Sequence, residues 1–283
     1  MTSDRPPLDA EALRARLAPS LVPRLELLER VGSTNSGLAA AASAEPEAWP
    51  DFSVLVADHQ AAGRGRAGRT WETPQGTALT MSILLRPPVP QEHWGWVSLL
   101  GALAVVRTVG AFGLVARAKW PNDVLVEARG ALELDGWGTG RKLAGVLGEL
   151  VPGGVVLGIG VNVLQTEDEL PVPWAGSLAS LGGTLGERAR EDVLVALVEQ
   201  LWQLDERWRA ADGDAAAAGL VEEYASASAT LGRTVAVERP GGEVVTGLAE
   251  GMADDGGLLV RRLDGEREIV RAGDVHHLRL PDV

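Results

Sequence analysis

The sequence predicts an α+β protein in which a mixed α/β domain precedes a small β-barrel. Residues up to about 229 alternate between apolar β-rich runs and segments with helical spacing, whereas the last 50 or so residues contain only short strands broken by turns. A hydrophobic fraction of 46% and a charged fraction of 23% are typical of a globular chain, and 283 residues can bury a core. We therefore divide the chain into an N-terminal extension (1–20), a mixed-sheet domain (21–229) and a C-terminal barrel (230–283).

Periodicity and capping residues predict the first elements. Residues 9–17 (DAEALRARL) could make two helical turns, too short for a DNA-reading domain. A longer helix is expected over residues 34–43, where the polar triplet at 33–35 precedes strong helix formers. Two β-rich runs follow at 52–60 and 77–87, joined by a long loop rich in glycine and arginine.

The middle of the domain continues this alternation. Residues 91–113 have helical spacing, and residues 116–127 (ARAKWPNDVLVE) are expected to form a strand that Pro121 interrupts. Two apolar strands are expected at 141–151 and 153–164. The pattern therefore predicts a sheet with polar joints between its strands.

The remaining segments differ in character. Residues 127–140 are rich in glycine and are expected to form a surface hairpin, which we interpret as a tolerated loop insertion of unassigned role. From Glu191 to about Ala229 the apolar residues are spaced to form one buried helical face. Beyond residue 230, the turn sequences PGG, DDGG and LDGE separate short alternating strands, which is typical of a small barrel.

Composition excludes several classes of function. The absence of cysteine excludes disulfides, a thiolate nucleophile and cysteine metal sites. His59 and His93 are isolated and the adjacent His276 and His277 would point to opposite faces of a strand, so a histidine metal site is not indicated. A net charge of −13 disfavours a nucleic-acid partner. We expect a cytoplasmic protein, because no signal peptide and no apolar run of about 18 residues occurs.

The basic residues are distributed unevenly. Lys119 and Lys142 are the only lysines, and the other 24 basic residues are arginine. A GC-rich coding bias would explain this, but it also marks the two lysines as candidates for work that needs a compact ammonium. The glycine–arginine loop, residues 63–69 (GRGRAGR), places three arginines in an acidic chain and predicts an anionic ligand; a flexible solvated turn is the alternative. The loop lacks the Lys-Ser/Thr of a P-loop.

Two further joints carry polar groups. After Pro121, Asn122 and Asp123 could offer an amide and a carboxylate to a sugar, to Mg²⁺ or to a backbone cap. Lys142 begins an apolar strand and needs an anionic partner, which a ligand carboxylate or, structurally, Glu149 could provide. With no G-x-S-x-G and no Ser-His-Asp arrangement, hydrolysis is disfavoured. Such a site would act by orienting a charged substrate and by electrostatic stabilisation.

Five motifs in order resemble the biotin protein ligases. They are GSTNS (32–36), DHQAAGRGRAGRTW (58–71), KWPNDVLV (119–126), RKLAGVLGEL (141–150) and GIGVN (158–162). The resemblance covers about residues 25–280 and implies that the barrel is SH3-like. It does not include an N-terminal winged helix, so the chain resembles the monofunctional class. Ala67 departs from many relatives, which carry arginine there, and implies a slightly less basic loop.

The resemblance also implies an activity and site residues. The enzyme would join biotin and MgATP into biotinyl-5′-AMP and then biotinylate one lysine of a biotin carboxyl carrier domain. The residues implied to hold biotin are Ser33, Thr34, Asn35, Gln60 (toward the carboxylate end of biotin), Arg64, Arg66 and Lys142, those implied to hold the nucleotide are Arg66, Arg69, Trp71, Asn122 and Asn162, and Asp123 would serve Mg²⁺. Lys142 and Arg66 would be the catalytic pair, with Lys142 on the carboxylate and α-phosphate and Arg66 in a closing loop.

Three alternatives remain open from the sequence. A lipoate ligase or lipoyl transferase would share the fold and the adenylation chemistry. A biotin-sensing transcription regulator would need a basic reading helix, which the sequence does not show. A catalytically inactive biotin-binding module is disfavoured by Lys142.

Exposed strand edges could serve the acceptor or a homodimer, and the sequence favours neither monomer nor dimer.

Overall fold

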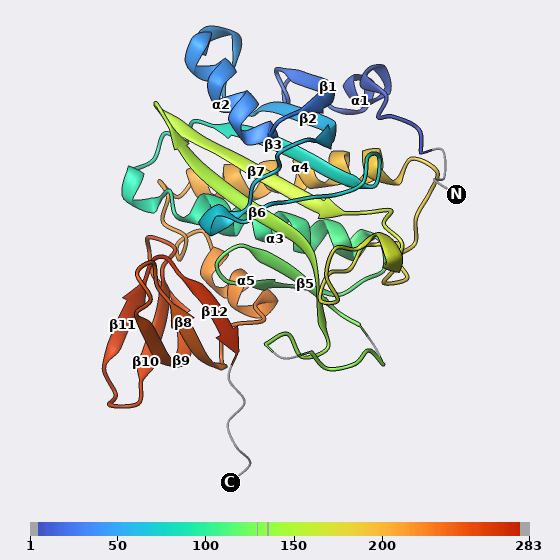
Figure 1. The fold of residues 1–283 in the computed structure, drawn as a ribbon. Helices are drawn as coiled ribbons and strands as arrows, with labels where there is room; N and C mark the ends of the chain where they lie inside the picture. Colours follow the sequence, from blue (N-terminus) through green and yellow to red (C-terminus); the bar gives the residue numbers. More distant parts are fainter. Residues whose placement is uncertain (1–4, 129, 135, 278–283) are drawn as a thin grey trace.

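The computed structural model describes residues 5–128, 130–134 and 136–277, and sequence expectations for the other positions lie outside the described residues. A seven-stranded sheet in the order β1-β2-β3-β7-β6-β5-β4 forms the larger part of the molecule (Figure 1). Only the β1–β2 pair is parallel, and the remaining pairs are antiparallel, so the sheet is mixed as predicted. A second, antiparallel sheet in the order β11-β10-β9-β8-β12 forms the C-terminal module.

The elements have the following bounds. The strands of the large sheet are β1 (Leu25–Val31), β2 (Ser53–Gln60), β3 (Ala78–Leu85), β4 (Ala116–Lys119), β5 (Asp123–Glu127), β6 (Gly140–Val151) and β7 (Gly154–Asn162). The strands of the C-terminal module are β8 (Thr234–Glu238), β9 (Val244–Met252), β10 (Leu258–Arg262), β11 (Arg267–Val270) and β12 (Asp274–His277). The helices are α1 (Ala10–Arg16), α2 (Thr34–Ala44), α3 (Trp96–Ala111), α4 (Ala189–Arg209) and α5 (Leu220–Ala227), with 3-10 turns η1 (Pro46–Ala48), η2 (Arg66–Gly68), η3 (Gln91–His93) and η4 (Glu167–Glu169).

Helices cover the two faces of the large sheet unequally. The long helices α3 and α4 pack against each other and lie behind the sheet in Figure 1, where they enclose the main core. On the opposite face, α2 packs on β2, β3 and β7 through a small core that includes Leu38, Leu84 and Val156. Because α2 is short, part of this face is left for the glycine–arginine loop and a pocket.

Three elements differ from the sequence prediction. Strand β1 was not predicted; it lies at the sheet edge, half-buried, so its charged residues hide the alternation. Residues 116–127 form two antiparallel strands instead of one interrupted strand, with Lys119 paired with Asp123 across a tight turn. The last predicted helix is broken between α4 and α5, where Gly213 and Gly219 have φ of 87° and 66°, which a helix does not allow.

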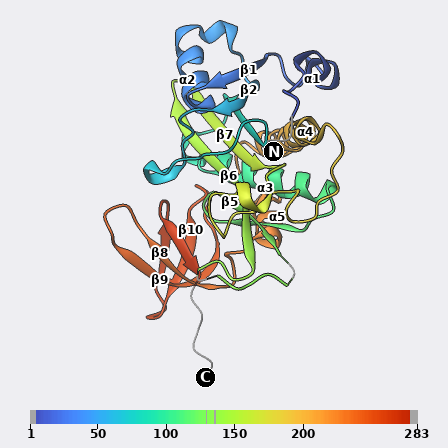
Figure 2. The same cartoon turned by 45° about the vertical axis from the view of Figure 1, so that its right-hand side comes forward.

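The N-terminal segment packs onto the mixed domain. Leu8, Leu13 and Leu17 are buried in the main core, and α1 contacts β1 and α4. At the other end, the Nε1 atoms of Trp96 and Trp120 donate to carbonyls in the turn between β9 and β10, at distances of 3.2 Å. Both Figure 1 and Figure 2 show the C-terminal module below the large sheet. The limits of the three segments, at residues 20 and 229, stay a prediction.

Among the described helices, none has the combination of length and apolarity that crossing a bilayer requires.

Candidate active site

A pocket lies on the α2 face of the large sheet, next to the N-terminus of α2. Alternation along the strands decides which positions face α2: Ser82 precedes Leu84 by two positions on β3, and Gly158 follows Val156 by two on β7, so all four are on the α2 face. The pocket is lined by Ser33, Thr34, Asn35, Gln60, Arg64, Gly65, Arg66, Arg69, Trp71, Met81, Asn122, Lys142, Gly145, Val146, Leu147, Gly158, Ile159 and Gly160.

Glycines on β7 create the depression. A Cβ at Gly158 would lie 2.2 Å from Oδ1 of Asn35, and one at Gly160 would lie 2.6 Å from the ring of Trp71. No larger residue fits without displacing these side chains. The ring of Trp71 therefore lies directly on the strand.

Four neutral side chains form a hydrogen-bonded group on one side of the pocket, which we name the polar group: Thr34, Asn35, Gln60 and Ser82. Oε1 of Gln60 accepts from the backbone N–H (2.8 Å) and the hydroxyl (3.1 Å) of Thr34. Gln60 thus caps α2, whereas Ser33, the N-cap residue and the first of the predicted polar triplet, makes no such bond with its side chain. Oγ of Ser82 lies 2.8 Å from Oγ1 of Thr34 and donates to Oδ1 of Asn35 (2.6 Å).

A carboxylate links the polar group to the glycine–arginine loop. Nδ2 of Asn35 donates to the carbonyl of Leu147 (3.0 Å) and to Oε2 of Glu149 (2.8 Å), and Arg64 donates to both oxygens of Glu149 at 2.8 Å. The sequence left Glu149 open as a structural alternative for the partner of Lys142. That alternative is wrong, because Glu149 binds Arg64 and Asn35.

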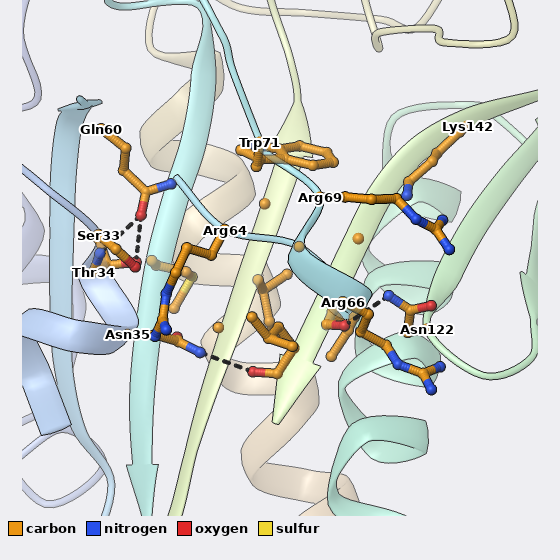
Figure 3. A pocket seen from close by; sticks show the side chains of 18 residues that line it. Ser33, Thr34, Asn35, Gln60, Arg64, Arg66, Arg69, Trp71, Asn122 and Lys142 are labelled. Atoms are coloured by element: carbon orange, nitrogen blue, oxygen red, sulfur yellow. Dashed lines mark hydrogen bonds between the residues drawn. The ribbon is translucent and has the colours of Figure 1, made fainter. Parts of the chain in front are cut away.

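Cations occupy the other side of the pocket, as Figure 3 shows: Arg66, Arg69 and Lys142 lie opposite Gln60 and Thr34. Burial lowers the pKa of the Arg66 guanidinium, while nearby carboxylates of Asp274 and Asp123 oppose this shift. Nη1 of Arg66 and Nε1 of Trp71 are buried donors with no protein acceptor among the described residues. Unsatisfied buried donors beside a cavity are suited to a ligand rich in oxygen. Gln60 and Lys142 were both expected at the carboxylate end of biotin. In the structure they lie on opposite sides of the pocket.

Lys142 is held by its side chain and by its backbone. Its Nζ forms an ion pair of 2.6 Å with Asp123 and lies 5.7 Å from the ring centre of Trp71. Its backbone N–H donates to the carbonyl of Trp174 (2.6 Å), and its carbonyl accepts from the N–H of Gly176 (2.9 Å). The side chain of Lys142 is 23% exposed and lines the pocket. Its backbone is held through both the N–H and the carbonyl.

The other predicted residues lie at different depths. Asn122 lines the pocket and donates to the carbonyl of Val146 (3.1 Å). Asn162, in contrast, does not line it; its buried amide donates to Gly176 (3.0 Å) and accepts from Gln165 (2.9 Å). Asn162 therefore stabilises the segment that follows β7 through its bonds to Gln165 and Gly176.

The second lysine is buried beneath the insertion at 127–140. Lys119 is 7% exposed, and its Nζ lies 4.1 Å above the ring of Trp137, which stacks on Trp174 with centroids 5.9 Å apart. Burial lowers the pKa of Lys119, and the nearby Asp123 opposes this effect. The insertion therefore packs against Lys119 and Trp174 through Trp137, which the interpretation as a tolerated loop did not anticipate.

The C-terminal module reaches the glycine–arginine loop. Asp274, at the start of β12, forms an ion pair with Arg69. Arg66 also lies with Trp120 and Arg271 in a second cavity between the large sheet and this module. The loop is thus bordered by both sheets.

No group of three or more His, Cys, Asp or Glu side chains that could hold a metal occurs in the described ranges. Asp123 is a single carboxylate next to the pocket. One carboxylate suits a Mg²⁺ ion that arrives bound to the phosphates of a nucleotide, because such ions keep most ligands from phosphate and water. The residues fit a metal that is part of the substrate.

Sequence reasoning missed Ser82, and it gave no role to Gly158 and Gly160 although both lie in the motif GIGVN. Ser82 is a polar residue within an apolar strand (ALTMSILL), and the two glycines recur at a spacing of two. Both signals were visible in the sequence, but each becomes meaningful only when β3 and β7 are known to be neighbours.

Comparison with known proteins places the chain in a family. Residues 27–165 match the biotin/lipoate A/B protein ligase family, and residues 230–278 match the biotin protein ligase C-terminal domain. The biotin–[acetyl-CoA-carboxylase] ligase of Mycobacterium tuberculosis is 40% identical over 282 residues, which cover 97% of both chains. The chain belongs to the biotin protein ligase family.

Other members of the biotin protein ligase family agree with this assignment. The biotin–[acetyl-CoA-carboxylase] ligase of Paracoccus denitrificans is 31% identical over 88% of this chain and 98% of its own. The structure of the Aquifex aeolicus biotin protein ligase in complex with biotin and ATP has a TM-score of 0.69 and 25% identity, covering 91% of this chain and 99% of that one. The predicted α+β fold, with a mixed-sheet catalytic domain and an SH3-like C-terminal sheet, is confirmed.

Proposed function

We propose that this protein is a biotin protein ligase that forms biotinyl-5′-AMP from biotin and MgATP and transfers biotin to one lysine of a biotin carboxyl carrier domain. One observation carries the proposal: a single pocket has neutral hydrogen-bonding side chains at one end and Lys142, Arg66 and Arg69 at the other. Such a pocket suits a ligand with a neutral polar ring and an acidic tail, which reacts next to a polyphosphate. The ligase relatives support the same reaction.

The polar group would recognise the ureido ring of biotin. Thr34, Asn35 and Ser82 are nearly fully buried and rest on α2 and β3, so their orientation is fixed before the ligand arrives. A site built for hydrogen bonds rejects an analogue that lacks the matching atoms, because its own groups then stay unpaired. This argues against lipoate, whose acyl chain has no ureido ring.

The cationic side would stabilise the charges of the first step. An oxygen of the biotin carboxylate forms a bond to the α-phosphorus of MgATP, and the bond from that phosphorus to the bridging oxygen breaks, releasing pyrophosphate. Lys142 would exchange its contact with Asp123 for the reacting carboxylate and α-phosphate, where a compact cation stabilises the developing charge. Arg66 and Arg69 would hold phosphate oxygens, with Asn122 and Trp71 beside the nucleotide.

The second step is the transfer to protein. The neutral amine of the acceptor lysine attacks the acyl carbon, the bond to AMP breaks, and the nitrogen loses a proton as the amide forms. The glycine–arginine loop would shield the adenylate from water until then. We place this reaction in the cytoplasm. Separately, the net charge of −13 supports a function without a nucleic-acid partner.

The test is incubation with MgATP, labelled biotin and a biotin carboxyl carrier domain, with label transfer followed by mass spectrometry and pyrophosphate and AMP release followed in parallel. We expect one biotin on one lysine of the carrier. Competition with lipoate distinguishes the alternative substrate. If lipoate is transferred and biotin is not, the family assignment stands and the proposed substrate is wrong.

A further inference from the structure

Residues 5–9, which we name the N-terminal strap, contact a segment that is far away in the sequence. Both terminal nitrogens of Arg5 donate to the carboxylate of Glu169, at 2.9 and 2.7 Å, and Nη2 also lies 3.3 Å from the carbonyl of Leu164. Arg5 is 15% exposed and Glu169 28% exposed as side chains. This forked, partly buried ion pair has a more defined geometry than an ordinary surface pair.

The segment that Arg5 holds, residues 164–176, ends at the backbone of Lys142. Trp174 accepts from the N–H of Lys142, and Gly176 donates to its carbonyl, so this segment adds a short parallel bridge beside the first residues of β6. A shift of the segment would move the backbone from which the reactive ammonium extends.

Between its ends the segment has few hydrogen bonds to the rest of the described chain. In the described part of the chain, residues 167–172 receive hydrogen bonds from outside the segment only through Arg5, whereas Thr166 and Glu169 bond to each other in a capping box. The neighbouring Arg5 is the main reason that the pKa of Glu169 falls to about 2. The ion pair is therefore formed at every pH at which the protein would be assayed.

The same strap also holds the base of the loop that carries the arginines. The N–H of Leu8 donates to Asp58 (3.2 Å), and Arg190 bridges Asp58 (2.7 Å) and the carbonyl of Pro6 (2.7 Å) in a buried arrangement. Asp58 lies two residues before Gln60, and its carbonyl accepts from Gly76, where the chain returns from the loop. A Cβ at Gly76 would lie 3.2 Å from Cβ of Arg5, so the two segments are in contact.

We propose that Arg5 is a positioning residue for the adenylation step, which acts by holding residues 164–176 in the arrangement that fixes the backbone of Lys142. The proposal rests on the proposed function, because it gives the segment a role in that reaction. The N-terminal segment is then part of the active-site scaffold, although it touches no substrate. The biotin end of the pocket should not depend on Arg5, whose hydrogen bonds go to Glu169 and Leu164, because the polar group is held by α2, β2 and β3.

The test compares Arg5→Ala, Glu169→Ala and the double variant with Arg16→Ala. The control removes another ion pair of the N-terminal region, between Arg16 and Asp192, whose side chains are 36% and 38% exposed. We expect the single-turnover rate of adenylate formation to fall about 10-fold in Arg5→Ala, since small displacements of a reacting group are costly. The Kd for biotin should stay within about twofold, and the double variant should match the single ones because the two residues act as one unit.

A merely structural role predicts a different result. In that case the thermal midpoint falls while the adenylation rate per folded molecule equals that of Arg16→Ala, which overturns the proposal, as do additive losses in the double variant. Arg5→Lys is a milder variant that keeps the charge and loses the fork; an intermediate rate supports the proposal.

Hydrogen exchange separates this proposal from the proposed function. Without substrates, the amides of residues 167–176 should exchange faster in Arg5→Ala than in Arg16→Ala. If the unaltered protein makes no adenylate, the proposed function fails, and the exchange result alone decides whether the strap holds the segment. Unchanged exchange would overturn the strap even if the unaltered enzyme is active.

Discussion

The two sides of the pocket differ in how their side chains are satisfied before any substrate arrives. The polar group is buried, with Ser82 fully inaccessible and Asn35 3% exposed, and its members bond to one another and to the backbone. The cationic side is more open: the side chain of Arg69, on the glycine–arginine loop, is 56% exposed, and that of Lys142 is 23% exposed. In the proposed function, one side would recognise its ligand by fixed geometry and the other by charges that exchange their protein partners for the ligand.

The cations also differ in their partners. Lys142, Arg64 and Arg69 each form an ion pair with a carboxylate of this chain: Asp123, Glu149 and Asp274 respectively. An anionic substrate therefore competes with carboxylates that already neutralise these cations. This arrangement limits repulsion among neighbouring cations in the free protein and allows the cations to change partners during the reaction.

The largest effect is expected at the cationic side. Lys142→Ala should lower the rate of adenylate formation about 10²–10³-fold, the range typical for loss of one electrostatic donor to a reacting oxygen. Pyrophosphate release in single turnover measures it. Lys142→Arg should also be strongly impaired, because a planar fork does not replace a compact ammonium. An unchanged rate in either variant would remove Lys142 from the mechanism.

Substitution in the polar group should weaken biotin binding instead of lowering the catalytic rate. Asn35→Ala removes an amide that bonds Leu147, Glu149 and Ser82, so biotin affinity should fall about 10-fold, consistent with roughly 1–3 kcal/mol for a buried group left unpaired. Titration calorimetry with biotin alone measures this. Ser43→Ala on the exposed side of α2 is the matched control. If Asn35→Ala loses catalytic rate and keeps its biotin affinity, the contrast between the two sides is wrong.

Retention of the intermediate should depend on the loop. Arg66→Ala removes a partly buried guanidinium that faces the pocket, so the adenylate should dissociate about 10-fold faster, in line with the role of closing loops. A chase experiment with unlabelled biotin and ATP follows the release of labelled adenylate. Arg14→Ala, an exposed arginine on α1, is the control. Equal dissociation rates in the two variants would contradict the retaining role.

The smallest effect is expected where the C-terminal module meets the loop. Asp274→Asn frees Arg69 from its exposed partner, so the KM for MgATP should fall about twofold at low ionic strength and the difference should vanish at high salt. Steady-state kinetics at two salt concentrations measures it. A salt-independent change would indicate that Asp274 acts through packing instead of charge.

Much of the fold and the site could be predicted from local patterns. The polar triplet before an alanine-rich run predicted α2, and the contrast between glycine–arginine and acidic sequence marked the loop that borders the pocket. Strand β1 could not be predicted in this way, since an edge strand buries too little surface to show a clear alternation. The partner of Lys142 could not be predicted either, because Asp123 and Lys142 are brought together by the pairing of β5 with β6.

The sequence by itself determined the chemical inventory: two lysines, a cluster of arginines in a glycine-rich segment, a polar helix start and no thiol. It also determined most of the succession of strands and helices, because strand and helix periods follow from local spacing. The parallel pair that makes the sheet mixed, β1 with β2, came only from the structure. Only the tertiary structure decided which groups meet. The register of β3 against β7 aligns Ser82 with Gly158 and leaves space for Asn35, and the strap connects Arg5 to Glu169 across 164 positions. Such contacts depend on long-range pairing, which local sequence does not encode.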